Sequence, residues 1–261
     1  MIKRILAGSI LAMILIGCGG SGGSSGTCFV YGVNALPNIG AVSITANGTL
    51  VMSDAGFGSS SSTFVATNAG TQAPVFLTNS SSTQIASGTT NFTDGDYYTA
   101  YALGNTQNNF VVIYPTDVSA PTANTGKLIF VNASVLQPSV DIYITLTGAT
   151  QGVASLTSIT PFNSGQEIAN LAPGTYDVQF KTAGTQNVLI DEPTVTIGTT
   201  ASSNEIQIVG ITDNVTASTP AQFALPIIPV PVVASASAPR NMGRPMVIKG
   251  GQILPTPAAH K

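Results

Sequence analysis

The sequence predicts an all-β protein with two tandem antiparallel β-sandwich domains and a disordered C-terminal tail. Only 7% of the 261 residues are charged, against about 25% in an ordinary soluble domain. Charged residues are therefore too few to form the outer faces of long amphipathic helices. Ser and Thr number 57, and such hydroxyls solvate strand surfaces well. Apolar residues also recur with a period of two, as at Tyr176, Val178 and Phe180, which is typical of half-buried strands.

An internal duplication predicts two domains of one kind. Val33-Asn34-Ala35 recurs as Val131-Asn132-Ala133, and NAGTQAPVFLT (68–78) aligns with APGTYDVQFKT (172–182). A repeat at this spacing indicates two copies of one unit. Turn signals such as Asn47-Gly48 separate the short apolar runs. About seven strands per copy are expected, as in an antiparallel sandwich.

The N-terminus predicts export and lipidation. Lys3 and Arg4 precede an uncharged run over 5–16, which is shorter than the roughly 20 residues of a membrane-spanning helix. Leu15-Ile16-Gly17-Cys18 resembles the bacterial lipobox. The resemblance implies that Cys18 is lipidated and anchors the protein to the membrane, the outer membrane rather than the inner because residue 19 is not Asp. The alternative is an ordinary secretory leader with a chance Cys.

These signals divide the chain into six parts. Prolines at 226, 229 and 231 restrict the segment after residue 219 to an edge strand, and the basic, Pro-rich end has no periodicity. The predicted parts are a signal peptide (1–17), the lipidated Cys with a Gly/Ser tether (18–27), the first sandwich (28–117), a linker (118–126), the second sandwich with its edge strand (127–233) and the disordered tail (234–261).

The repeated motifs resemble a known family. The second copy carries V-N-A at 131–133, V-D-I-Y at 140–143 and A-P-G-T-Y-D-V at 172–178, and these resemble tandem bacterial domains of the domain-of-unknown-function family 4397. The first copy departs, with Ser43 in place of the Asp. The resemblance covers about 28–215. It implies an immunoglobulin-like or transthyretin-like sandwich on an exported protein, and no activity.

Catalytic and cofactor chemistry is not expected. The single His260 is the penultimate residue, so no imidazole base can be held beside a nucleophile. Lys127 and Lys181 could serve a lysine dyad, but no S-x-x-K sequence occurs. Residues 28–219 carry eleven acidic and two basic side chains, which disfavours nucleic-acid binding. The protein is therefore predicted to be no enzyme and to need no cofactor.

Two local features leave alternatives open. Asp94 and Asp96 are weak candidates for a Ca²⁺ loop, because this cation takes clustered oxygens, although Asp is also common in turns. Cys28 is either a reactive thiol or, as we favour, a small buried residue that opens the first strand.

A partner contact is predicted on the first copy. When Gly104 is aligned with Gly210 and Gly70 with Gly174, five apolar residues are expected to face outward where the second copy is polar. They are Tyr97, Tyr101, Leu103, Val75 and Leu77. Such a patch suits a protein partner. The alternatives are that the second domain or the tail covers it, or that a one-residue slip reverses the faces.

The expected function is therefore that of a non-enzymatic, lipid-anchored envelope protein, either a spacer or a module that binds another envelope protein. The alternative is a surface adhesin or a ligand- or Ca²⁺-binding module. The sequence leaves the oligomeric state open.

Overall fold

The structure is a computed structural model. It describes residues 26–37, 39–104, 109–134, 136–137, 139–162, 166–198, 205–214, 221–224, 228–230, 232, 246–249 and 252–254. Within these ranges every regular element is a strand, as predicted. No helix in the described part of the chain is long and apolar enough to cross a membrane. The leader, Cys18 and His260 lie outside the described residues.

The first sandwich has an inner and an outer sheet. The inner sheet has the order β4-β1-β7-β8 and the outer sheet β3-β2-β5-β6. The bounds are Thr27–Asn34 for β1, Val42–Ala46 for β2, Thr49–Ala55 for β3, Val65–Asn68 for β4, Gly70–Asn79 for β5, Gln84–Phe92 for β6, Tyr97–Gly104 for β7 and Asn109–Pro115 for β8.

The second sandwich repeats this arrangement. Its inner sheet has the order β12-β9-β15-β16, with β17 also on β15, and its outer sheet is β11-β10-β13-β14. The bounds are Gly126–Asn132 for β9, Val140–Leu146 for β10, Leu156–Ile159 for β11, Gln166–Leu171 for β12, Gly174–Thr182 for β13, Val188–Ile197 for β14, Glu205–Asn214 for β15, Ala221–Ala224 for β16 and Ile228–Val230 for β17.

Each sandwich departs from the purely antiparallel pattern at one pair. β1 runs parallel to β7, and β9 runs parallel to β15. The chain between the members of each pair passes through the outer sheet, and such a crossover allows two strands of one sheet to run in the same direction. The two copies therefore share the strand order and the position of the parallel pair.

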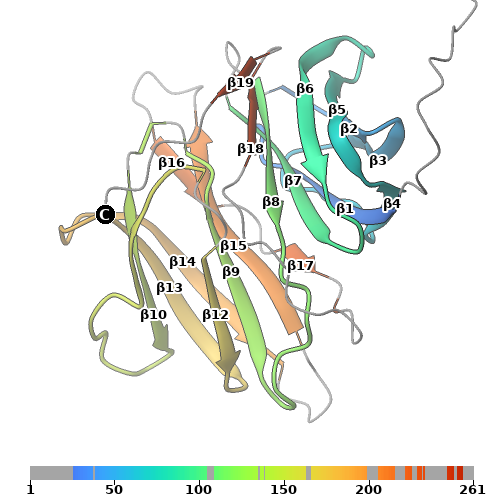
Figure 1. The fold of residues 1–261 in the computed structure, drawn as a ribbon. Helices are drawn as coiled ribbons and strands as arrows, with labels where there is room; N and C mark the ends of the chain where they lie inside the picture. The colour runs from blue at the N-terminus through green and yellow to red at the C-terminus, as the bar shows by residue number, and fades with distance from the viewer. Residues whose placement is uncertain are drawn as a thin grey trace, which may run out of the picture.

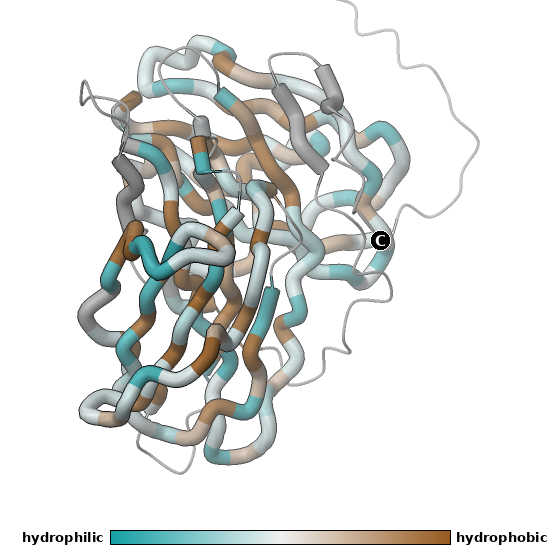
Figure 2. The backbone as a smooth tube through the Cα atoms, turned by 90° about the vertical axis from the view of Figure 1, so that its left-hand side faces the viewer, coloured by the Kyte–Doolittle hydropathy of each residue, from teal (hydrophilic) through white to brown (hydrophobic). Residues whose placement is uncertain are grey.

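The four sheets stack in layers, outer–inner–inner–outer (Figure 1). Three apolar clusters fill the spaces between them: a core in each sandwich and a third cluster between the two inner sheets, which we call the inter-sandwich interface. In β1, Val30 contributes to the first core, whereas Tyr31 and Val33 lie in the interface. Inner strands are thus buried on both faces, and hydrophobic residues recur along the backbone throughout the molecule (Figure 2).

The repeated V-N-A motif has a structural role in both copies. The Asn34 side chain accepts a hydrogen bond from the Leu36 N–H and donates to the Ala55 carbonyl at the end of β3. Asn132 likewise accepts from Ser134 N–H and donates to the carbonyl of Ile159 in β11. Both asparagines are buried, so the motif joins the end of the first strand to the third strand.

The C-terminal segments return to both sandwiches. β17 lies on β15, where an edge strand was expected, with Ile228 opposite Ile208. Within the tail predicted to be disordered, the structure describes β18 (Met246–Lys249) on β8 and β19 (Gln252–Leu254) on β18. Strand β8 would otherwise present an open row of backbone N–H and C=O groups, which β18 covers. The other residues of 234–261 lie outside the described residues.

Candidate functional site

The predicted contact residues of β7 face away from the first core. Tyr98, Ala100 and Ala102 belong to that core, whereas Tyr101 and Leu103 lie in the inter-sandwich interface. This alternation agrees with the prediction. The face is not free, however, because the second inner sheet covers it and leaves Tyr101 only 1% exposed. The prediction of an accessible contact at Tyr101 and Leu103 is therefore wrong, and only Tyr97, at the margin, stays half-buried.

The alignment behind that prediction is also wrong. Val33 lies opposite Tyr101 in one copy, and Val131 lies opposite Gly210 in the other. Gly210 thus corresponds to Tyr101 and not to Gly104. In addition, Ile208 faces the first sandwich and not its own core. The two errors cancel for β7, so its faces are predicted correctly from a wrong alignment. Both errors arise because a strand that is buried on both faces has no polar side from which its register can be read.

The prediction for β5 is wrong by one residue. Val75 and Leu77 are fully buried in the first core, whereas Phe76 between them is half-buried. The pairing of β5 with β6 shifts between Gly70 and Ala73, where Gln72 has a φ of 54°. This bulge adds one residue before Val75 and so exchanges the two faces relative to β13.

A buried lysine gathers two carboxylates at the joint between the sandwiches. Lys127, in β9, is only 2% exposed, and its Nζ lies 2.9 Å from Oδ2 of Asp117 and 3.7 Å from Oε2 of Glu167. Nζ also donates to the Asp117 carbonyl oxygen at 3.3 Å. Asp117 follows β8, and Glu167 belongs to β12. We call these three residues the Lys127 cluster, which attaches the inter-sandwich linker to the second inner sheet.

The surroundings affect the two carboxyl groups in opposite ways. Burial alone would raise the pKa of Asp117, but hydrogen bonds from Ser119 and Lys127, with the charge of Lys127, outweigh it and lower this pKa. Burial raises the pKa of Glu167, and the nearby ammonium group offsets this only in part. Glu167 therefore holds a proton at higher pH than an exposed glutamate does, whereas Asp117 favours the carboxylate.

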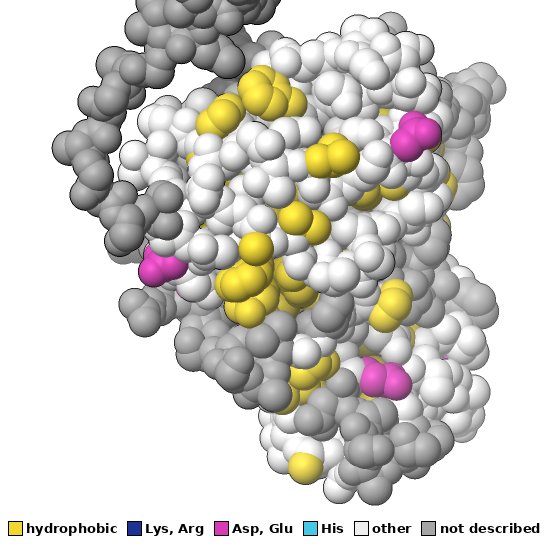
Figure 3. Space-filling view, turned by 90° about the vertical axis from the view of Figure 1, so that its right-hand side faces the viewer, with side chains coloured by type: hydrophobic (Ala, Val, Ile, Leu, Met, Phe, Trp, Pro, Cys, Tyr) yellow, Lys and Arg dark blue, Asp and Glu magenta, His cyan; other side chains and the backbone are white. Residues whose placement is uncertain are grey.

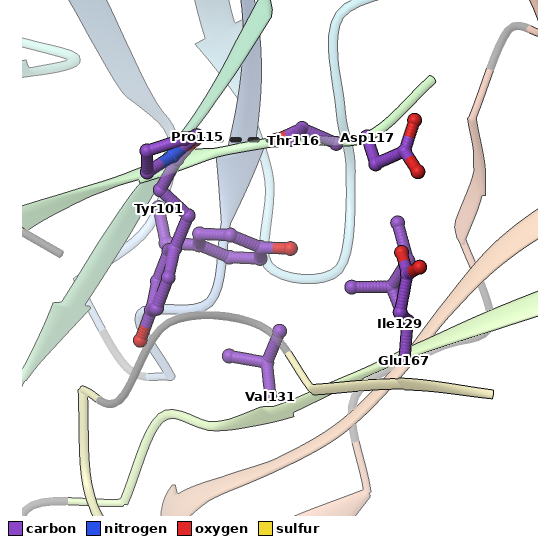
Figure 4. Close-up of a pocket in the computed structure, with 8 residues that line it drawn as sticks. Tyr101, Pro115, Thr116, Asp117, Ile129, Val131 and Glu167 are labelled. Carbon is purple, nitrogen blue, oxygen red and sulfur yellow. Dashed lines mark hydrogen bonds between the residues drawn. The ribbon is translucent and has the colours of Figure 1, made fainter. Parts of the chain in front are cut away.

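A small cavity adjoins the cluster (Figure 4). Its volume of about 10 Å³ is close to the least that holds one water molecule. The Tyr114 hydroxyl is buried and has no hydrogen-bond partner. The cavity is lined by residues of both sandwiches and the linker: Tyr101, Tyr114, Pro115, Thr116, Asp117, Ile129, Val131 and Glu167. The cavity therefore brings apolar walls, an unpartnered hydroxyl and two carboxyl groups together.

Sequence reasoning missed the Lys127 cluster. The sequence suggests Lys127 only as the lysine of a catalytic dyad, and it gives no reason to pair Lys127 with Asp117 and Glu167. The sequence does contain one signal. Residues 28–219 include only two basic side chains, and one of them, Lys127, lies ten positions after Asp117.

Asp94 and Asp96 lie in the turn before β7, where the Asp94 side chain and the Asp96 backbone accept hydrogen bonds from β1. Oδ1 of Asp94 accepts a hydrogen bond from Thr27 N–H at 2.8 Å, and the carbonyl of Asp96 accepts one from Phe29 N–H at 3.0 Å. Gly95 between them has a φ of 79°. In the described ranges, no three His, Cys, Asp or Glu side chains gather as a metal site would need.

Cys28 is expected to be unreactive in the folded protein. Its side chain is fully buried, and burial raises the pKa of the thiol to about 12, so almost no thiolate forms at neutral pH. In a Cys18→Ala variant, a thiol reagent such as DTNB should label Cys28 only after denaturant is added. Complete labelling of the native protein within minutes would contradict this prediction.

The face shown in Figure 3 is polar but almost uncharged. Hydrophobic side chains form small patches among uncharged groups, a few acidic side chains are scattered between them, and the described residues show no Lys or Arg there. Such a surface offers little electrostatic attraction to a charged partner.

Residues 29–143 match the model of a family described as a domain of unknown function, DUF4397. The match supports the family resemblance seen in the sequence, and it extends through the first sandwich and the linker into β10. No curated protein matches the chain.

Proposed function

We propose that this protein is a non-enzymatic module of the bacterial cell envelope, anchored through a lipid on Cys18 to the outer membrane rather than to the inner membrane. It acts there as a rigid spacer or binds another envelope protein. The observation that carries the proposal is the inter-sandwich interface, which joins the two sandwiches into one body after the Gly/Ser-rich segment that follows Cys18 in the sequence.

The contacts across the interface support this rigidity. Leu103 and Ile208 are fully buried there. Two hydrogen bonds also cross it, from Thr212 Oγ1 to the Ala35 carbonyl at 3.1 Å and from the Tyr31 hydroxyl to the Pro229 carbonyl at 3.1 Å. Tandem domains that move independently usually meet through smaller and more polar surfaces.

The uncovered margin of the first inner sheet supports a protein contact. Phe29 stacks on Tyr97 with ring centroids 4.7 Å apart, and Phe64 meets Tyr97 edge-on at 5.1 Å. All three rings are half-buried. Rigid aromatic side chains of this kind are favoured in protein interfaces, so we place the partner contact here rather than at Tyr101 and Leu103.

Metabolic labelling with a radioactive fatty acid tests the anchor. The wild-type chain and a Cys28→Ala variant should carry label and sediment with membranes, whereas a Cys18→Ala variant should lose both. Cys28 serves as the matched control because it is the only other cysteine. Equal labelling of the Cys18→Ala variant would end the proposal of a lipid anchor.

Site-specific photocrosslinking in intact cells tests the contact. A crosslinker at Phe64 should give a discrete adduct with an envelope protein, whereas one at Val153, which is 90% exposed on the second sandwich, should not. Adducts at Val153 alone would place the partner elsewhere.

A further inference from the structure

We propose that Lys127 and Asp117 join in an intramolecular isopeptide bond, for which Glu167 carries the protons. The bond would be a covalent staple across the joint between the sandwiches. This inference does not depend on the lipid anchor or on any partner.

The geometry places the reacting groups in contact. Nζ of Lys127 touches the Asp117 carboxyl group, 2.9 Å from Oδ2, and Glu167 reaches to 3.7 Å from the same nitrogen. Both sides of the new bond are fixed by the fold, since Lys127 pairs with Ile206 in β15 and Asp117 accepts a hydrogen bond from Ser119 N–H. An amine held against a carboxyl group in this way has a very high effective concentration.

The reacting groups are largely shielded from water. The side chains of Lys127 and Asp117 are 2% and 11% exposed, so little solvent competes with their direct contact. The resting state is the ion pair, because the pKa of Asp117 is lowered. Transfer of one proton from Nζ to Oδ2 along their existing contact gives the amine and the carboxylic acid without any change in net charge.

The bond then forms by condensation. The lone pair of Nζ attacks Cγ of Asp117, while protonated Glu167 donates a proton to the carboxyl oxygen and its carboxylate afterwards receives one from Nζ. The C–OH bond breaks and one water molecule leaves. Carboxylic acid and amine thus become amide and water, Glu167 is regenerated, and no oxidant or cofactor takes part. The raised pKa of Glu167 supports this exchange.

The adjoining cavity suits the leaving group. It has room for about one water molecule, and both Asp117 and Glu167 line it. The unpartnered Tyr114 hydroxyl can hydrogen-bond to that water. Figure 4 shows the two carboxyl groups on the same side of the cavity.

The chain contains a matched control. Lys181 is also buried, but its Nζ donates to the amide oxygens of Gln151 and Gln186 at 2.8 and 3.1 Å and lies over the ring of Tyr143. The two primary amides are stable to amines, and the aromatic ring has no group that an amine can attack. Lys181 thus lacks the carboxyl group that condensation requires. Lys181 should therefore remain a free amine.

Peptide mass spectrometry of the full-length protein, purified from cells, tests the proposal. After denaturation, cleavage with chymotrypsin after Phe110 and Phe130 releases a peptide that contains both reacting residues and no lipid. We expect its mass to be lower than the sequence mass by about 18 Da, one water. Fragmentation should give no backbone ions from cleavage between Asp117 and Lys127, because the bond closes a ring.

Four variants identify the bond. Lys127→Met, Glu167→Gln and Asp117→Asn should each give the full mass of the variant sequence, whereas Lys181→Met should keep the loss of water. A wild-type peptide at full mass, after days of incubation of the folded protein, would overturn the proposal. A loss of water that persists in Lys127→Met would also overturn it, since that result would identify dehydration of an aspartate alone.

Discussion

The variant Ile208→Asp is expected to split the unfolding of this protein into two transitions. Ile208 is fully buried between the two inner sheets and belongs to neither sandwich core. A carboxylate there can be hydrated only if the sheets separate, and leaving it buried without a partner would cost at least about 3 kcal/mol. Both cores stay intact, so each sandwich should unfold by itself.

Differential scanning calorimetry measures this outcome. The wild type should show one cooperative transition, and Ile208→Asp should show two, with faster proteolysis within the linker at 118–125. Val153→Asp, at a largely exposed position, is the control and should behave as the wild type. A single transition at lower temperature in Ile208→Asp would mean that the sandwiches do not form separate cooperative units.

Replacement of Asn132 by Ala is expected to destabilise the second sandwich by about 2–4 kcal/mol. Its side chain makes two hydrogen bonds at 3.1 Å, to the carbonyl of Ile159 and from the N–H of Ser134, in a fully buried position. Alanine leaves both backbone groups without these partners, at about 1–3 kcal/mol each. Asn34→Ala should have a similar effect on the first sandwich, where the same pair of contacts recurs.

Urea denaturation of each variant measures the free energy of unfolding. Asn187→Ala serves as the control, because that side chain is exposed and its removal should change stability by less than about 0.5 kcal/mol. An effect of Asn132→Ala no larger than that of the control would show that water replaces the lost contacts.

The strands and the duplication can be predicted from the sequence because one face of each outer sheet is directed toward solvent, so polar and apolar residues alternate along its strands. In β13, Tyr176, Val178 and Phe180 are buried in the second core, whereas Thr175, Asp177 and Gln179 between them are half-buried, so the alternation is directly visible. The inner strands are apolar on both faces, as in β9, where all seven residues are buried. Periodicity then cannot show what each face of the strand packs against. From the sequence, coverage of the predicted contact by the second domain was therefore only one of the alternatives.

The remaining differences have local or long-range causes that a single sequence does not show. The bulge at Gln72 places a non-glycine residue at positive φ, which few sequence signals mark. The Lys127 cluster depends on the pairing of β12 with β9, which sets Glu167 opposite Ile129. That contact joins residues far apart in the chain, and no spacing rule connects them.

The position of β1 has a mechanical consequence. The tether leads directly into this strand, which lies between β4 and β7 with six residue pairs in the parallel ladder to β7. A pull on the tether along the strand direction loads these hydrogen bonds in shear, so that they share the force and must fail together. A force perpendicular to the strand would instead open them one after another. The same domain should therefore resist stretching from its N-terminal end far better than peeling from its side.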